Sequence, residues 1–270
     1  MIVLFTDFGL SGPYLGQLQA AILKEFSAAR IVNLFADAPA RDPRRSAYLL
    51  AAYAEEFPAP AVFVCVVDPG VGSERRALAL EAGGRWFVGP DNGLLEIVAR
   101  RAAAPSWWRI GWRPPRLSPS FHGRDLFAPV AAWLDRGDRP GGMPSAPRPP
   151  AGWAEPLAQG GLGYGDWPDD LAEVIYIDRF GNAMTGLRAA TLSSGTGIIL
   201  KDGREIVHAR TFSDVPKGGV FWYENANGLM EIAMNCGRAD VALGLTLGSP
   251  VAVRPWAFAG RGRENNNIRS

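Results

Sequence analysis

The most constraining feature of the sequence is an unbroken apolar run that ends in an aspartate and a turn. Residues 61–67 read Ala-Val-Phe-Val-Cys-Val-Val, with no alternation of polar and apolar side chains. Such a run predicts a strand buried on both faces of a parallel sheet. Asp68-Pro69-Gly70 follows directly, and proline and glycine do not continue a strand. The carboxylate of Asp68 is therefore expected at the carboxyl end of a central strand, where ligand crevices of open α/β sheets form.

A turn-capping role is the simple alternative for Asp68, because aspartate is common in turns. A second polar cluster, residues 121–125 with the sequence Phe-His-Gly-Arg-Asp, contains one of only two histidines in the chain. Together Asp68, Arg75 and His122 form a chemically plausible group. An arginine stabilises the ionised form of a neighbouring carboxylate, and a histidine can orient a water molecule or share its proton. The residues alone thus predict a crevice that activates water or binds a ligand.

The first half of the chain alternates strand and helix patterns. A short strand at 2–5 is followed by the polar turn Thr6-Asp7-Phe8-Gly9 and by a helical pattern from about residue 14 to 26. Strand, turn and helix make the first half of a βαβ unit, which places Asp7 at a strand end as well. Helix capping is the alternative for Asp7. Further expected elements are a strand at 31–35, a hairpin at 76–88, helices at 44–57, 94–101 and 127–134, and an irregular stretch around Trp107, Trp108 and Trp112.

The pattern of predicted elements changes after a stretch rich in proline and glycine. These two residues supply nine of the sixteen positions from 137 to 152, which indicates a linker or an irregular loop. Short strand patterns separated by glycine-rich turns follow, and they favour a small antiparallel barrel or sandwich. They lie at 173–178, 197–200, 205–208, 220–223, 229–234 and 251–253. We therefore predict an α/β domain with a mostly parallel sheet (1–150), a smaller antiparallel β-barrel domain (151–260) and a flexible tail (261–270).

Composition and charge exclude several classes of partner. The chain has 28 basic and 27 acidic residues, a formal net charge of +1, so no field attracts nucleic acid or an anionic membrane. No apolar run is long enough to span a bilayer. With no signal peptide before the first strand, we expect a cytoplasmic protein. Cys65 and Cys236 both lie in apolar segments, and we expect them as buried thiols in that reducing compartment.

Several standard sites are also missing from the sequence. Two histidines and no spaced cysteine pair give no standard metal site. There is no glycine-rich phosphate-binding motif of the Walker or dinucleotide type, so a cofactor held through its phosphates is not expected. There is also no Gly-x-Ser-x-Gly elbow, so a serine hydrolase is not indicated.

Five short motifs, in this order along the chain, resemble the S-adenosylmethionine (SAM) hydrolase family. Its members are also called SAM hydroxide adenosyltransferases and are relatives of the SAM-dependent chlorinase and fluorinase. The motifs occupy residues 6–9, 67–72 with Arg75, 89–95, 121–125 and 178–183. The resemblance runs from residue 2 to about residue 254 and implies an α/β domain, a β-barrel domain and a homotrimer. It also implies that SAM is the substrate, with no other cofactor, bound between one subunit's N-terminal domain and its neighbour's C-terminal domain.

The resemblance assigns roles to single residues. Asp68, Arg75 and His122 match the family's water-activating triad, and the family reaction is attack of water on the ribose C5′ carbon to give adenosine and L-methionine. The expected substrate-binding set contains Asp7 for the ribose hydroxyls, Asn182 for the adenine, Asp178 near the methionine amino group, and Phe8, Phe180 and Cys236. No metal ligand is expected.

The chain departs from the family pattern at a few positions and leaves two alternatives open. Gly12 stands where an aspartate is usual, Arg41 replaces an aromatic residue and Gly186 an asparagine, and Ala226-Asn227 replaces a serine and an aromatic residue. The altered methionine end favours a non-catalytic protein that binds SAM or adenosine. The other alternative is an adenosyltransferase that uses a halide. The halogenating relatives carry an aromatic residue in place of Asp68, so water is the expected nucleophile.

Overall fold

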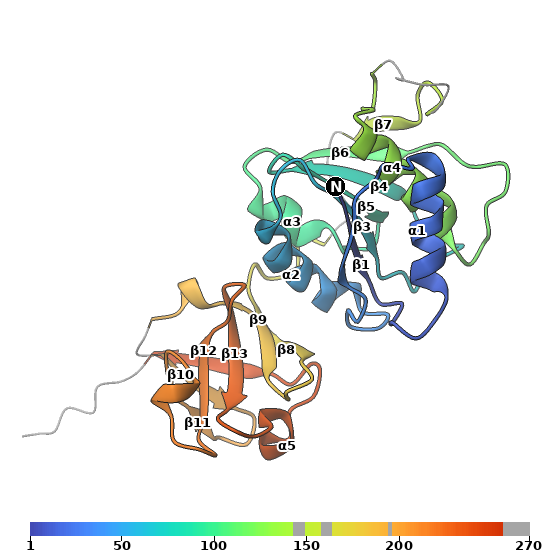
Figure 1. Ribbon diagram of the computed structural model, residues 1–270. Coiled ribbons are helices and arrows are strands. Elements are labelled where there is room, and N and C mark those ends of the chain that lie inside the picture. Colours follow the sequence, from blue (N-terminus) through green and yellow to red (C-terminus); the bar gives the residue numbers. More distant parts are fainter. Residues whose placement is uncertain (143–148, 158–163, 194–195, 256–270) are drawn as a thin grey trace, which may run out of the picture.

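The computed structural model describes residues 1–142, 149–157, 164–193 and 196–255, in an α/β part and a β part (Figure 1). The predicted tail 261–270 lies outside the described residues, and the domain boundary near residue 150 stays a prediction. None of the helices in the described ranges combines the length and the apolar character needed to cross a membrane.

The α/β part is built on one seven-stranded mixed sheet with the strand order β2-β1-β3-β5-β4-β6-β7. The strands are β1 (Ile2–Thr6), β2 (Ile31–Phe35), β3 (Val62–Val66), β4 (Ala77–Ala82), β5 (Arg85–Pro90), β6 (Ser106–Ile110) and β7 (Ala154–Leu157). β2, β1, β3 and β5 run parallel, whereas β4, β6 and β7 pair antiparallel. The predicted α/β fold is confirmed, and the parallel half is the half that contains the Asp68 strand.

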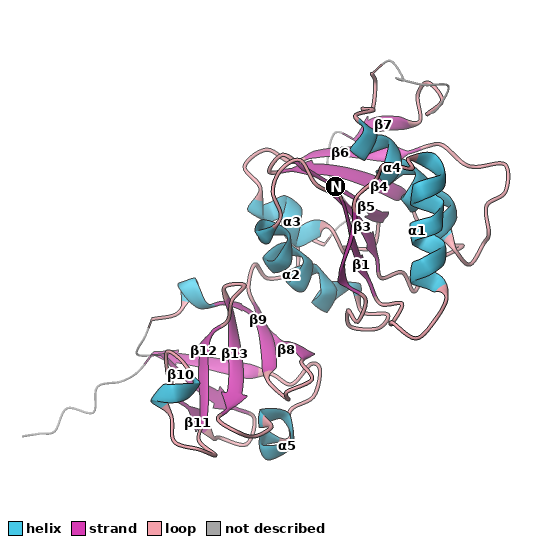
Figure 2. Ribbon diagram, viewed as in Figure 1, coloured by secondary structure: helices cyan, strands magenta, loops and turns pink. Residues whose placement is uncertain are grey.

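Helices cover both faces of this sheet (Figure 2). The helices are α1 (Tyr14–Glu25), α2 (Pro43–Tyr53), α3 (Glu96–Arg101) and α4 (Ala128–Arg136). Side chains of α1 and α4 pack with Ile2 and Leu4 in one apolar core, and those of α2 and α3 pack with Val3 and Phe5 in another. Alternate residues of β1 thus enter opposite cores, which is why the inner strands are apolar throughout rather than alternating.

The tryptophan-rich stretch is not irregular, as the sequence suggested, but contains strand β6. Ser106–Ile110 pairs antiparallel with β4 on one side and with β7 on the other. Trp107 is buried, and Trp112 packs edge-on against Trp133. The neighbouring strand β7 contains Pro156, which an edge strand tolerates because one row of its N–H groups needs no ladder partner.

The β part consists of two small antiparallel sheets that share one core, which confirms the predicted antiparallel barrel. One sheet has the order β12-β13-β9-β8 and the other β11-β10-β14. Val174, Ile198 and Trp222 come from different strands of the two sheets and meet in the shared core. The elements are β8 (Leu171–Ile177), β9 (Ala183–Arg188), β10 (Thr196–Leu200), β11 (Glu205–Ile206), β12 (Val220–Glu224), β13 (Leu229–Met234), α5 (Ala239–Leu243) and β14 (Val251–Pro255).

The two parts touch within one chain through α2 and β8. The Nη2 atom of Arg45 donates to Oε2 of Glu173 at 2.6 Å, and the hydroxyl of Tyr176 donates to Oδ2 of Asp37 at 3.3 Å. These contacts join the α2 face of the sheet, and the loop after β2, to strand β8 of the barrel.

Candidate functional site

Asp68, Arg75 and His122 lie together at the carboxyl end of β3. Nε of Arg75 donates to Oδ1 of Asp68 at 2.7 Å, and Nη2 of Arg75 forms an ion pair with Oδ2. The same Nη2 lies 3.2 Å from Nδ1 of His122. The Asp68 and Arg75 side chains are only 4% and 9% exposed. The guanidinium therefore holds the carboxylate through both oxygens and connects it to the imidazole, a geometry that only arginine provides.

Two local features fix this arrangement. Gly72 has φ +83°, and a Cβ atom there would come 2.5 Å from the carbonyl oxygen of Pro119. A residue without a side chain is needed for the turn after Asp68 to approach the segment that carries His122 so closely. On the other side, Nδ2 of Asn92 donates to the carbonyl oxygen of Val67 at 2.9 Å, which fastens the end of the β3 segment to the turn after β5.

The contact with Arg75 defines the state of His122. A guanidinium has no acceptor, so Nδ1 of His122 accepts the hydrogen bond and the neutral ring carries its proton on Nε2. Burial lowers the pKa of His122, and the positive charge of Arg75 lowers it further. His122 is therefore a neutral donor at Nε2 near neutral pH, suited to holding a water oxygen. A cavity of about 350 Å³ lies beside Arg75 and His122.

Asp7 lies at the same edge of the sheet, because β1 pairs parallel with β3. Its Oδ2 accepts a hydrogen bond from the backbone N–H of Arg41 at 2.9 Å. Burial raises the pKa of Asp7, the Asp68 charge adds to the rise, and the Arg41 N–H opposes it. Arg41 has a positive φ of 60°, and its backbone N–H is the group that donates to the carboxylate. Phe8 packs edge-on against Phe121, directly before His122.

The remaining predicted site residues line a separate cavity of about 640 Å³ in the β part. The Asp178 carboxylate closes a turn there, with Oδ1 accepting from the N–H groups of Phe180 and Asn182, each at 2.9 Å. Its Oδ2 accepts from Nδ2 of Asn182 at 3.0 Å. Phe180 is 69% exposed, whereas Asn182 is buried. Thirteen described residues line this cavity: Asp178, Phe180, Asn182, Met184, Phe212, Tyr223, Asn225, Ala226, Asn227, Glu231, Met234, Cys236 and Gly237.

The two cysteines differ, and the sequence prediction is wrong for one of them. Cys65 is fully buried in β3, and burial raises the pKa of its thiol well above the ordinary value. Cys236 is exposed. It follows strand β13 in a turn with φ +55°, so the apolar pattern of the strand no longer determines where its side chain lies. The expected contact of Cys236 with substrate stays compatible with this, because the residue lines the cavity.

The structure thus brings the predicted residues together in two groups rather than one. Asp7, Phe8 and the Asp68 group lie at the sheet edge, and the described lining of the β-part cavity comes entirely from residues 178–237. Tyr223, Asn225 and Glu231 line that cavity and were not predicted from the sequence. The available signal was an acidic residue inside the apolar strand Leu229–Met234. Within the described ranges, no three His, Cys, Asp or Glu side chains gather in a group that could hold a metal ion.

Comparisons with known proteins match nearly the whole chain. Residues 2–143 match the model of the SAM hydroxide adenosyltransferase N-terminal domain, and residues 172–252 match that of the C-terminal domain. The chain is 40% identical over 264 residues to an (R)-S-adenosyl-L-methionine hydrolase of Thermus thermophilus, covering 93% of this chain and 98% of the relative. A protein of the same name from Salinispora arenicola is 37% identical over 261 residues, covering 92% and 95%.

Solved structures show the same fold. An uncharacterized conserved protein from Thermotoga maritima superimposes with a TM-score of 0.80 at 28% identity, covering 94% of this chain and 99% of that one. A conserved hypothetical protein from Thermus thermophilus gives a TM-score of 0.72 at 35% identity, with the same coverage of 94% and 99%.

Proposed function

The chain belongs to the SAM hydroxide adenosyltransferase family, and we propose that it hydrolyses SAM to adenosine and L-methionine by attack of water on the ribose C5′ carbon. The main support for this proposal is the hydrogen-bonded group of Asp68, Arg75 and His122 at the carboxyl end of β3. The names of the relatives at 40% and 37% identity support the same substrate.

In the proposed reaction, Asp68 takes a proton from the attacking water. Arg75 occupies one position on each carboxylate oxygen, and each oxygen keeps a further lone pair for the water. The Nε2–H of His122 orients the water oxygen. As the C5′–O bond forms, the C5′–S bond breaks and its electron pair goes to sulfur, so the sulfonium becomes neutral methionine thioether. Charge disappears in this step, which a water-poor pocket favours.

The residues outside this group would hold the substrate. Asp7 has a carboxylate at the same sheet edge and is proposed to accept hydrogen bonds from the ribose hydroxyls. Asp178, Phe180, Asn182 and Cys236 line the β-part cavity, which we propose to receive the adenine and the methionine amino group. Its described lining includes the carboxylate of Asp178 and no cationic side chain, which suits a sulfonium substrate.

Incubation of the protein with SAM tests the activity, with adenosine and methionine separated by chromatography. We expect equal amounts of the two products in the absence of halide. Binding of SAM or adenosine without turnover would support the non-catalytic alternative. A 5′-halogenated nucleoside formed on addition of chloride or fluoride would support the halide-using alternative.

We further propose a homotrimer in which each site combines the sheet edge of one subunit with the β-part cavity of its neighbour. Arg75 and His122 line one cavity, and Asp178, Phe180, Asn182 and Cys236 line another. A head-to-tail contact that joins the two in neighbouring subunits forms a closed ring where its rotation closes. The expected mass by light scattering is about three times the subunit mass of 29.0 kDa. A single-subunit mass together with full activity would contradict the proposal.

Subunit mixing tests whether the site is shared. An Asp68→Asn variant loses the sheet-edge half and an Asn182→Ala variant loses the cavity half. If the two are denatured together and refolded at equal amounts, about a quarter of the sites combine two intact halves. Activity should therefore recover to about a quarter of the wild-type value. Activity that stays at the sum of the separate variants would show that each site lies within one subunit.

A further inference from the structure

We propose that Glu231 is a positioning residue for the substrate cavity, acting through Asn225 on the loop that forms part of its wall. Glu231 lies in β13 and is only 2% exposed, although it is acidic. Its Oε1 accepts from the hydroxyl of Tyr223 at 2.8 Å, and its Oε2 accepts from Nδ2 of Asn225 at 2.8 Å. A buried carboxylate is retained only where donors meet its oxygens, and here one donor comes from the loop after β12.

The side chain of Asn225 also forms hydrogen bonds with the backbone of the loop. Its Oδ1 accepts from the backbone N–H of Asn227 at 2.9 Å and from that of Leu229 at 3.0 Å. The Glu231 carboxylate sets the orientation of the Asn225 amide, because a carboxylate oxygen accepts a hydrogen bond and so must face the NH2 group, Nδ2. The amide oxygen is then directed at the two loop N–H groups. Three hydrogen bonds therefore fix one buried side chain at the base of a four-residue loop.

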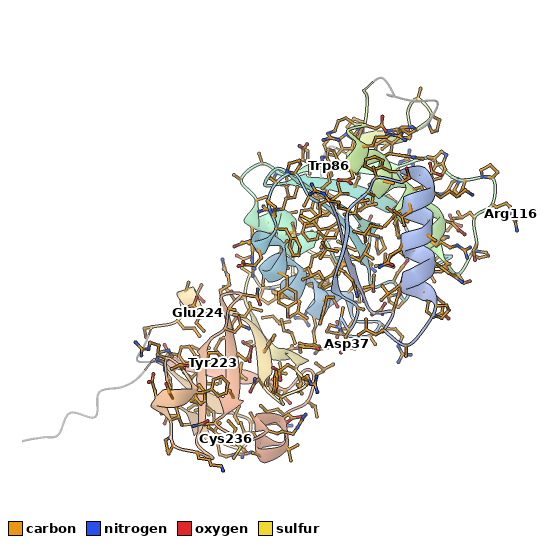
Figure 3. All side chains as sticks on the ribbon, viewed as in Figure 1. Asp37, Trp86, Arg116, Tyr223, Glu224 and Cys236 are labelled. Atoms are coloured by element: carbon orange, nitrogen blue, oxygen red, sulfur yellow. The ribbon has the colours of Figure 1, made fainter. Side chains whose placement is uncertain are left out.

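The loop held in this way belongs to the cavity wall. Ala226 and Asn227 lie in this loop between Asn225 and Leu229, and both line the cavity together with Asn225 and Glu231. Tyr223, the other partner of Glu231, lies in β12 and lines the cavity as well; Figure 3 labels it in the β part, as it does Cys236. A change at Glu231 would therefore alter the shape of the cavity before it altered any contact with the water-activating group.

The inference rests on the proposed function, and a swap of the two polar partners tests it. Asn225→Asp places a second carboxylate opposite Glu231, so the loop is pushed away, and KM for SAM should rise at least about 10-fold with kcat within about 3-fold. In the double variant Asn225→Asp with Glu231→Gln, the introduced amide donates to the introduced carboxylate, whose other oxygen still accepts from the loop. KM should return to within about 3-fold of wild type.

Two further variants separate positioning from charge. In Glu231→Gln alone, the amide oxygen still accepts from Asn225 and the NH2 group still meets the Tyr223 oxygen, so KM should stay within about 3-fold. Glu224→Gln is the matched control, because Glu224 is an exposed acid at the end of β12, directly before the loop. It should leave KM unchanged. In Glu231→Leu, the side chain can no longer accept hydrogen bonds, so KM should rise as it does in Asn225→Asp. This variant provides a second test if Asn225→Asp does not fold.

The results distinguish the two proposals. Wild-type turnover of SAM tests the function by itself, and dissociation constants for SAM, measured by calorimetry on folded variants, test the positioning even without turnover. An unimpaired Asn225→Asp, or a double variant as impaired as Asn225→Asp, overturns the positioning role. So does a Glu224→Gln variant impaired to the same degree as Glu231→Leu.

Discussion

Replacing Asp68 by asparagine is the most informative single test of the proposed chemistry. The change keeps the size of the side chain and removes the charge and basicity that the water would need. General-base assistance typically contributes about 10²–10⁴ in rate, so kcat should fall at least about 10²-fold, equivalent to about 2.7 kcal/mol of barrier. The affinity for SAM should change much less, because Asp68 is assigned to the water rather than to the substrate.

The structure also shows a second consequence of this variant. Arg75 forms a bidentate pair with Asp68, and both side chains are nearly buried. Removing one partner of a buried pair leaves an uncompensated charge and typically costs about 3–5 kcal/mol of stability. A loss of activity could therefore follow from unfolding alone, and the experiment needs a control that loses a similar pair and leaves Asp68, Arg75 and His122 unchanged.

The neighbouring residues provide that control. Nε of Arg76 lies 2.7 Å from Oδ2 of Asp91, whose side chain is 1% exposed, in the turn after β5. Asp91→Asn should therefore lower the melting temperature in the same direction as Asp68→Asn, while its kcat stays within about 3-fold of wild type. Initial rates of adenosine formation at saturating SAM, measured well below both melting temperatures, compare the two. Wild-type kcat in folded Asp68→Asn would falsify the general-base role. An equal loss of kcat in both variants would assign the effect to the lower stability of this edge of the sheet.

Two more predictions concern pH and substrate binding. Burial and the Arg75 charge lower the pKa of His122 below its ordinary value of 6.5, so the neutral ring predominates at pH 6.5 and above. The ratio kcat/KM should stay level from about pH 8 down to 6.5 and fall only at lower pH; a decline centred above 6.5 would contradict the neutral donor. Asp7→Ala should weaken SAM and adenosine alike, by about 1.5–3 kcal/mol for each lost hydrogen bond to the carboxylate, as measured by calorimetry. Unchanged affinity for adenosine would remove Asp7 from the ribose site.

The sequence predicts the strand before Asp68 well because burial on both faces requires an apolar residue at every position. Phe63 and Cys65 enter one core, and Val62 and Val64 the other, so no position of the strand tolerates a polar residue. The turn is equally visible, since Asp68-Pro69-Gly70 cannot continue a strand. Where physics allows few residue types at consecutive positions, a single sequence is enough to locate a strand end and the side chain on it.

Strand β9 shows where this reasoning fails. Ala183–Arg188 has weak strand propensity and contains Gly186, which in isolation indicates a turn or a bulge. In the structure a Cβ atom at Gly186 would lie 2.6 Å from Cβ of Leu171, so the glycine is there to let β8 approach. The requirement comes from a residue fifteen positions earlier in the chain. No local pattern contains it, and the strand is formed by pairing with β8 and β13.

The positions of Glu231 and Cys236 were beyond sequence reasoning for a related reason. The first five residues of β13 are all buried, including Glu231 between Met230 and Ile232, whereas Cys236, two residues after the strand, is exposed. Hydrophobicity ranks the two residues in the opposite order. Glu231 is buried because Tyr223 and Asn225 direct donors at it, and those donors depend on the pairing of β12 with β13. The polar residues that line a pocket are therefore selected by partners distant in sequence, so that a single sequence reveals the group of Asp68, Arg75 and His122 more readily than the polar residues of the β-part cavity.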